Sequence, residues 1–415
     1  MLAIRPLIPL LITAGVLLAG NGLQGTLIAI RGTSEGFSTI QIGAMGAGYF
    51  LGFMIGALVV SRLLQAVGHI RLFSAMAAIA ASGTLVFILW VDPLAWFGLR
   101  ILMGFCFSCL FATVDSWINS GVRNEIRAKV LSVYRLVDIA CVTGSQFLIP
   151  FIGAEGFAIF AVMTMMVCIS MVPISLADRS NPRQPSQVSF SLNKVWQISP
   201  IACIGCIAIG LTGATFRLVG PVYAQSIGMS VAAVATFMSA GIFGGAVLQY
   251  PLGWLSDKYG RREVLIIATL GAAAAGYFIT GCAKDDHHLN LIGIFMFGAF
   301  SLPLYSLSAA HANDHATKDE FIQVAAGLMF FWSIGAIIGP VAGSYMMELY
   351  GPFVLFYFTS IVHGVLAVVT LWRMWVRGVV PENRRTKFAM LMRTSPMMMK
   401  LTRKSSKKAN DAKQH

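Results

Sequence analysis

The feature that most constrains this chain is a series of long apolar runs separated by short polar breaks. A helix needs about 20 mostly apolar residues to cross the hydrocarbon core of a bilayer. The chain has 415 residues, of which 57% are hydrophobic and 11% charged, unlike a soluble globular protein. Its runs are continuous rather than alternating, which argues against a membrane β-barrel. The sequence therefore predicts an all-α polytopic membrane protein.

The apolar runs predict twelve spans, and the longest polar break follows the sixth. The first run is too long for the core of a signal peptide. The break, residues 178–197, contains DRSNPRQPSQ and predicts a cytoplasmic linker. It separates a first half, 1–177, from a second half, 198–376, and a basic tail follows at 377–415. We predict spans at 7–30, 42–61, 70–91, 94–120, 130–151, 156–177, 198–224, 230–252, 263–283, 288–310, 323–346 and 352–376.

Lysine and arginine alternate between rich and poor loops, which predicts the orientation. Short cytoplasmic loops retain these residues, and one topology with both termini cytoplasmic satisfies the rule. The opposite loops hold little more than Arg31 and Lys284. The net charge of +13 then reflects loops and a tail that lies against anionic lipids, and not nucleic-acid binding. The cytoplasmic set includes Arg5, Arg62, Arg71, Arg123, Arg127, Lys129, Arg179, Arg183, Lys194, Lys258, Arg261, Arg262 and Lys318.

Two pairs of similar segments indicate that the halves are repeats. GWLSDKYGRRE, from Gly253, has a weaker counterpart in SRLLQAVGHIR, from Ser61. NSGVRNEIRAKV, from Asn119, corresponds at nearly the same offset to NDHATKDEFIQV, from Asn313. Many secondary transporters consist of repeated halves, with the substrate site between them near the bilayer midplane.

The loop from Gly253 resembles the loop signature of the major facilitator superfamily. The resemblance implies twelve helices in two six-helix halves, with no enzymatic activity. It also implies a cytoplasmic gate, whose charges form and break contacts as the halves rock. In the first-half copy, Gln65 and His69 replace the acid and an arginine, so that gate is weaker or differently wired. The alternative is that the charges only set topology. The match comprises Gly253, Leu255, Asp257, Lys258, Gly260, Arg261 and Arg262.

Further segments resemble the same superfamily. Arg100 with Gly104 is similar to its helix 4 arginine motif, which is often tied to proton coupling. GAIIGPVAG, residues 335–343, is similar to an element that the drug-antiporter branch places in its fifth span, but here it lies in the predicted span 323–346. The runs PVYAQSIGMS, LQYPLGWLSDK and PLYSLSAAHAND are most similar to the bacterial YcaD-like branch, mostly without assigned substrates. The resemblance implies a bacterial inner membrane.

Three ionisable residues form a predicted cluster towards the cytoplasmic side. An ionisable group in mid-membrane costs about 2.5–3.5 kcal/mol on insertion scales. Asp115 and Arg135 lie at similar depth, and Asp138 shares a helix face with Arg135. Two acids around one arginine can respond to protons, because neutralising one changes the charge balance of the other. The alternative is a static ion-pair cluster that holds the inner gate.

A second group lies towards the outer side and is the predicted substrate site. It contains Arg100, Arg217, Gln146, Asn21 and Gln24. Two arginines facing one aqueous cavity favour an anionic or carboxylate-bearing solute, because guanidinium is a planar donor that stays charged. The alternative for Arg100 is that it extends to the outer interface or caps a neighbouring helix end.

Three aromatic residues complete the predicted substrate path: Tyr223, Tyr305 and Trp332. No phosphate-binding loop or nucleophile constellation occurs. The cysteines lie in apolar helices, where they are small packing residues. We expect no cofactor and no metal site.

These observations predict a monomeric secondary transporter that moves a small solute by alternating access, coupled to protons. One alternative is an exporter of amphipathic drugs or siderophores. Another is a membrane receptor that uses a transporter fold.

Overall fold

The computed structural model describes residues 8–121, 127–176, 191–284, 286–317, 320–376 and 388, and these residues form helices and no strand. The predicted linker before residue 191 and the tail other than Phe388 lie outside them. The helices are α1 (Ile8–Ser34), α2 (Thr39–Val67), α3 (His69–Leu89), α4 (Pro93–Gly121), α5 (Arg127–Ser145), α6 (Leu148–Ile152), α7 (Phe157–Leu176), α8 (Leu192–Ile198), α9 (Pro200–Ser226), α10 (Val231–Tyr259), α11 (Arg261–Phe278), the π-helix η2 (Ile279–Ala283), α12 (His287–Ser301), α13 (Leu304–His315), α14 (Phe321–Tyr350) and α15 (Val354–Val376).

The described residues contain twelve segments long and apolar enough to cross a membrane, which confirms the predicted fold class. Three segments are interrupted: α5 continues as α6, α11 as η2, and α12 as α13. Several helices are longer than predicted. For example, α2 begins at Thr39 because the Ser38 hydroxyl accepts from the amide of Gln41 in a capping box. Hydropathy identifies only the apolar part of a helix that fits the hydrocarbon core of the bilayer. It therefore misses polar helix ends such as this one.

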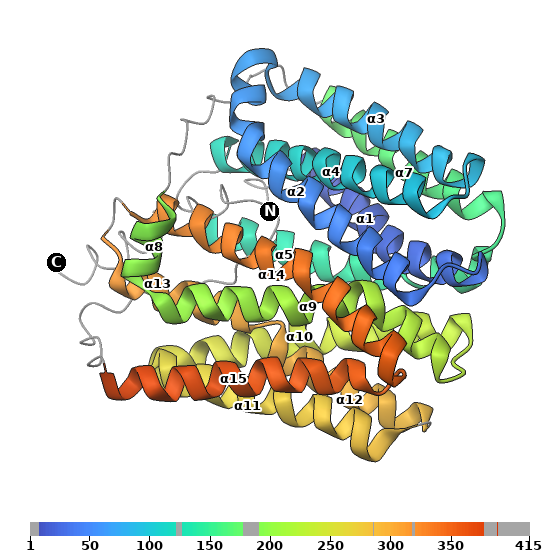
Figure 1. Cartoon of the computed structure of the whole chain (residues 1–415). Helices are drawn as coiled ribbons and strands as arrows, with labels where there is room; N and C mark the ends of the chain where they lie inside the picture. Colours follow the sequence, from blue (N-terminus) through green and yellow to red (C-terminus); the bar gives the residue numbers. More distant parts are fainter. Residues whose placement is uncertain are drawn as a thin grey trace.

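The helices pack side by side along one axis (Figure 1). α3, α4 and α7 lie in the upper part of the view and α11, α12 and α15 in the lower part, with α5, α9, α10 and α14 between them. We call the end with Arg62, Lys194 and Lys258 the basic end, and the end with Arg31 and Asp92 the opposite end. The short helix α8 lies at the basic end, on the left of Figure 1.

Glycines bring helices into close contact at equivalent places in the two halves. Where α2 crosses α4, Gly52 lies against the Ile101 carbonyl and Gly104 against the Tyr49 carbonyl. Where α10 crosses α12, Gly244 and Gly298 make the same kind of contact. The repeat that aligns Ser61 with Gly253 also aligns Gly52 with Gly244. Close backbone approach through small residues is the usual way membrane helices associate, and the crossing is therefore repeated with the sequence.

Leu218 of α9 joins the two halves on the side of the opposite end. It lies against Gly25 of α1 and Gly46 of α2, where a Cβ at Gly46 would come within 2.6 Å of Leu218 Cδ1. Nearer the surface, the amide of Ile40 donates to Glu348 Oε2 at 3.0 Å. These contacts between α1, α2, α9 and α14 hold the halves together at this end.

An ion-pair network occupies the loop between α10 and α11 at the basic end. Gly260 turns the chain with a φ of 123°, a backbone conformation that favours glycine. Arg261 is nearly buried, and its guanidinium lies 3.1 Å from Asp314 and 2.5 Å from Asp257. It also donates to Ser256 Oγ at 2.6 Å. The network therefore ties α10, α11 and α13 together.

Other residues of this loop face outward or meet the tail. Lys258 is exposed and stacks on the rings of Trp254 and Tyr259, at 5.2 and 5.1 Å. The ring of Phe388 lies against Gly253, and its amide donates to the Asp257 carboxylate at 3.0 and 3.1 Å.

The helix α8 is attached to the start of α14. Lys194 Nζ lies 2.8 Å from Glu320 Oε1, and its hydrogen bond lowers the pKa of Glu320 from 4.5 to about 2. Because the folded-state pKa is lowered, this ion pair persists at neutral pH and is lost only as the pH falls towards about 2.

The close crossing of α2 and α4 predicts the effect of a single methyl group. Gly104→Ala should lower the melting temperature of the purified protein, although alanine is the better helix former, because the new Cβ meets the Tyr49 carbonyl. Overpacking of this kind costs about 1–3 kcal/mol. Gly98→Ala in the same helix is the control, since nothing lies within 4 Å of a Cβ there. Equal melting temperatures for the two variants would contradict a tight crossing.

The network at the basic end predicts a second stability difference. Arg261→Gln should destabilise the protein by up to about 3–5 kcal/mol, because it removes a buried guanidinium from two carboxylates. Lys258→Gln removes an exposed charge from the same loop and should change stability by less than about 0.5 kcal/mol. Thermal denaturation in one detergent compares the two. An Arg261→Gln variant as stable as Lys258→Gln would mean that the network does not stabilise this state.

Candidate functional site

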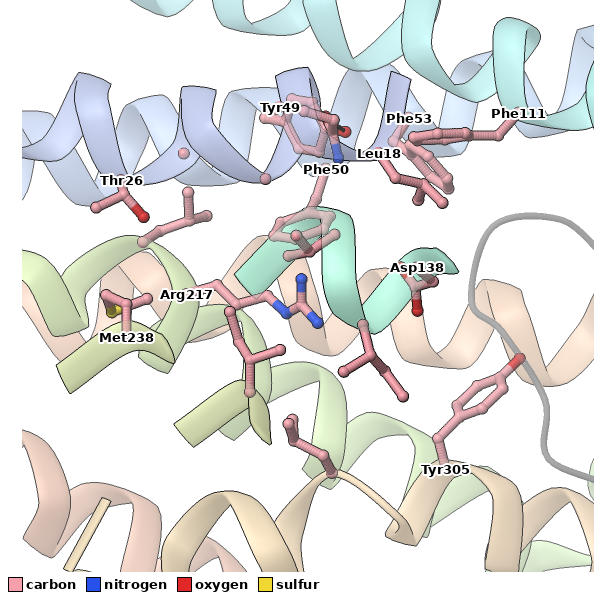
Figure 2. Close-up of a pocket in the computed structure, with 18 of the residues that line it drawn as sticks. Leu18, Thr26, Tyr49, Phe50, Phe53, Phe111, Asp138, Arg217, Met238 and Tyr305 are labelled. Carbon is pink, nitrogen blue, oxygen red and sulfur yellow. Dashed lines mark hydrogen bonds between the residues drawn. The ribbon is translucent and has the colours of Figure 1, made fainter. Parts of the chain in front are cut away.

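A cavity of about 160 Å³ lies between the two halves, near the middle of the bundle. This volume has room for roughly ten water molecules. Its walls come from α1, α2, α4 and α5 of the first half and from α9, α10, α13 and α14 of the second. Figure 2 shows the side chains around it. The predicted site residues that line it are Asn21, Arg100, Arg135, Asp138, Gln146, Arg217, Tyr305 and Trp332.

Arg100 is fixed in the wall of the cavity by partners from two helices. Its Nη1 donates to Gln24 Oε1 at 2.9 Å, and its Nε donates to the Met45 carbonyl at 3.4 Å. The guanidinium also stacks on Tyr49, 4.4 Å from the ring centre, and the Tyr49 hydroxyl donates to Asn21 Oδ1 at 2.6 Å. The alternative prediction for Arg100 is therefore corrected: the side chain is 2% exposed and does not extend to an interface.

Arg135 and Asp138 form an ion pair on the cavity face of α5. Arg135 also reaches the second half, where its Nη2 donates to Gln249 Oε1 at 2.6 Å. Gln249 Nε2 in turn donates to Ser306 Oγ of α13 at 3.1 Å. A polar chain thus runs from the ion pair across the cavity wall to the second half.

Arg217 of α9 differs from the other two arginines because its guanidinium makes no hydrogen bond or ion pair with any residue that the structure describes. It is partly exposed and extends into the centre of the cavity beside Phe50 (Figure 2). Asp138 and Arg135 are near enough to interact with it electrostatically. On either side in the sequence, Phe216 packs in the second-half core and Leu218 lies against α1 and α2, which fixes the position of Arg217.

The predicted grouping of Asp115 with Arg135 and Asp138 is not found. Asp115 is fully buried and accepts from the Tyr134 hydroxyl at 3.0 Å, whereas Arg135 pairs with Asp138. Asp115 of α4 and Arg135 of α5 were predicted to lie at equal depth, but their side chains face different neighbours. Asp115 is outside the set that lines the cavity.

Other predicted residues also lie away from the cavity. Tyr223 is fully buried among aromatic rings of the second half and donates to Asn290 Oδ1 at 2.8 Å. Gln24 lies behind Arg100 and supports it. The predicted gate residues are at the basic end and do not line the cavity: Gly253, Asp257, Lys258, Gly260, Arg261 and Arg262.

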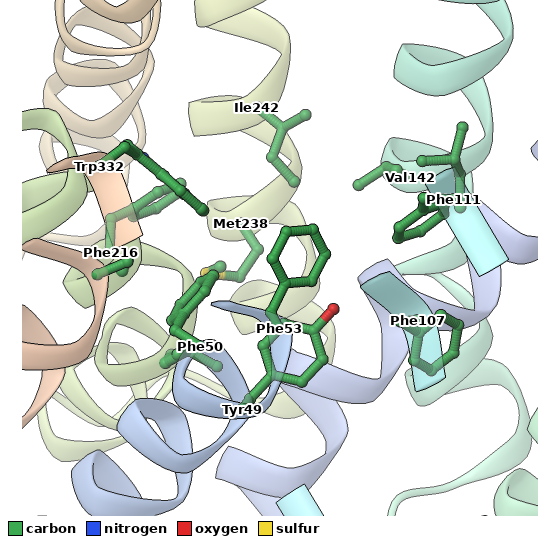
Figure 3. Close-up of a cluster of buried hydrophobic side chains, with 14 of the residues drawn as sticks. Tyr49, Phe50, Phe53, Phe107, Phe111, Val142, Phe216, Met238, Ile242 and Trp332 are labelled. Carbon is green, nitrogen blue, oxygen red and sulfur yellow. The ribbon is translucent and has the colours of Figure 1, made fainter. Parts of the chain in front are cut away.

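The sequence prediction missed several residues that line the cavity. Tyr49, Phe50 and Phe53 of α2 and Phe111 of α4 form an aromatic surface on the first half (Figure 3). Nothing in the sequence distinguishes these rings from lipid-facing ones. Gln249 was detectable, because it is a polar residue in the middle of an apolar run, which is the criterion that identified Gln24 and Gln146.

The charges of the cavity do not balance. Three guanidinium groups and one carboxylate line it, leaving a formal excess of two positive charges. Arg100 has hydrogen-bond acceptors and a π face, and Arg135 has Asp138. Arg217 has no comparable partner among the described residues. A cavity with this excess of positive charge attracts an anion, and a guanidinium can hold a carboxylate through two parallel hydrogen bonds.

Curated relatives cover almost the whole chain. An uncharacterized MFS-type transporter of Yersinia pestis is 25% identical over 389 residues, covering 92% of this chain and 97% of the relative. The MFS-type transporter YcaD of Escherichia fergusonii is 22% identical over 369 residues, covering 88% and 95%.

Solved transporter structures have the same fold. The crystal structure of nucleoside transporter NupG matches with a TM-score of 0.75 at 13% identity, covering 90% of this chain and 100% of that chain. A bacterial homologue of the human lysosomal transporter Spinster, in an inward-facing and unoccupied conformation, matches with a TM-score of 0.66 at 13% identity and 97% coverage of both.

The model of the Major Facilitator Superfamily matches residues 10–199 and 201–406. This match and the relatives confirm the resemblance seen in the loop signature. The chain belongs to the Major Facilitator Superfamily and is a multi-pass membrane transporter, not an enzyme, that acts on a small molecule.

Proposed function

We propose that this protein carries a small organic anion across a bacterial inner membrane by alternating access, and that a proton moves with it. The observation that carries the proposal is the guanidinium of Arg217, which lines the central cavity without a hydrogen-bond or ion-pair partner among the described residues. A charge in such a place is costly unless it is hydrated or paired. A substrate anion supplies the missing partner.

Asp138 is the proposed proton site. While it is ionised, it holds Arg135 in an ion pair. Protonation of Asp138 removes this attraction and leaves Arg135 available to a second oxygen of the anion bound at Arg217. Loading one proton and one anion then leaves the net charge of the cavity unchanged. Proton and anion therefore favour each other's binding, which is the coupling a symporter requires.

The contacts between the halves support the proposed alternating access. Leu218 and the Ile40–Glu348 hydrogen bond join them on the side of the opposite end. With the basic end in the cytoplasm, as the distribution of lysine and arginine favours, this state receives substrate from inside. Rocking of the halves would release Leu218 from its glycines and expose Arg217 to the other side.

The test uses purified protein in liposomes that contain a pH-sensitive dye. Pools of organic anions are added with and without an imposed pH gradient. We expect one or more pools to cause flux with pH movement. Asp138→Asn should lose the pH movement and gradient-driven accumulation but retain exchange of anion for anion. Arg217→Gln should lose both, because a charge-assisted contact of about 1.5–3 kcal/mol is removed, which weakens apparent affinity by at least about tenfold.

Arg71→Gln is the matched control, because it removes an exposed positive charge outside the cavity and should transport like the parent protein. Full activity of Arg217→Gln would refute the anion site. Anion flux without pH movement in the parent protein would refute proton coupling and leave Arg135 with Asp138 as a static gate. Saturable binding without flux would indicate a receptor.

A further inference from the structure

The apolar part of the cavity is an aromatic wall, which we define as Phe50, Phe53, Phe111 and Trp332. The rings come from both halves: Phe50 of α2 and Trp332 of α14 meet edge to face, with centroids 5.3 Å apart. Phe53 and Phe111 continue the wall along α2 and α4 (Figures 2 and 3). Each side chain is at most 7% exposed, and each borders the cavity.

The aromatic wall begins beside Arg217, at Phe50, and extends away from it (Figure 2). In Figure 2, Arg217 extends from the second half to the centre of the cavity, while Phe53 and Phe111 lie on the first half, further towards the basic end. Asp138 comes from α5. A molecule whose anionic group reaches Arg217 can therefore place an apolar body beside these rings, while polar side chains such as Asn21, Gln146 and Tyr305 line other parts of the cavity.

The number of available charges limits the anionic part of the ligand. The guanidinium groups of Arg100 and Arg135 already have Gln24 and Asp138 as partners. Arg217 is the cation of the cavity that lacks such a partner within the described residues, and in the proton-loaded state proposed above Arg135 reaches the second oxygen of the same anionic group, so the two match one carboxylate. A second carboxylate on the same molecule would then have to lie against the aromatic wall, which is unfavourable for an anion.

We infer that the substrate is an aromatic monocarboxylate, with its carboxylate on Arg217 and its ring against the aromatic wall. This inference rests on the proposed anion transport and specifies its substrate class. Ring contacts favour a planar aromatic body over a small polar one, because they bury apolar area and allow edge-to-face or offset stacking.

The test measures binding of named probes to the purified full-length protein by calorimetry and by thermal shift. Benzoate and 1-naphthoate are compared with acetate, succinate and benzylamine. We expect the aromatic acids to bind at least about tenfold more tightly than acetate, and the amine not to bind. Phe53→Ala should weaken benzoate binding about tenfold and leave acetate binding unchanged, and Arg217→Gln should abolish binding of both.

Phe243→Ala is the matched control, since Phe243 is 52% exposed and outside the cavity lining. It should bind benzoate like the parent protein, which would also separate a local effect from loss of folding. If acetate or succinate binds through Arg217 and benzoate binds no better, the aromatic inference is wrong and anion transport stands. If none of the acids binds in an Arg217-dependent manner, both proposals are wrong. Binding of benzylamine would contradict the inferred monocarboxylate substrate and favour an exporter of amphipathic cations.

Discussion

The structure depends on how guanidinium groups are accommodated inside a bundle of apolar helices. Each such charge is unfavourable in hydrocarbon and needs water, a counter-ion or hydrogen-bond acceptors. Arg100 is accommodated by an amide oxygen, a backbone carbonyl and a π face, and Arg135 by a carboxylate and an amide. These two solutions draw polar residues of α1, α2, α5 and α10 towards one place. The guanidinium of Arg217 faces the cavity without such a partner among the described residues, and it is the group to which we assign the proposed anion.

The repeated halves provide the frame in which these charges can act. Gly52 with Gly104, and Gly244 with Gly298, bring equivalent helices into backbone contact. These glycines do not tolerate a larger residue, because even the methyl group of alanine has no room at the crossing. The contacts between the halves include Leu218 in a glycine recess, one pair of aromatic rings, a few hydrogen bonds and a close approach of α2 to α14, where Gly43 lies against Ser344 and the Pro340 carbonyl. Rocking of the halves, as proposed above, would have to separate these contacts while the crossings inside each half stay closed.

Much of the fold could be predicted from the sequence, because long apolar runs allow little besides spanning helices. The interruption before Pro303 and the polar ends of α2 were missed, since they depend on local backbone chemistry rather than on hydropathy. For the site, the sequence predicts how deep a residue lies along its helix, but not which way its side chain faces. Arg217 and Asp138 do border the cavity, but Asp115 faces Tyr134. Which side of a helix meets a neighbour is set by packing between distant segments, and the sequence of one chain carries little information about it.

Arg217 and Leu218 are consecutive residues of α9, and the two side chains have different tasks. One extends into the cavity and the other fills the recess formed by Gly25 and Gly46. A single peptide unit therefore separates the guanidinium that faces the cavity from the side chain that joins the two halves. If an anion binds at Arg217 as proposed, recognition of the substrate and the contact between the halves belong to the same turn of α9, and the proposal needs no relay through other helices.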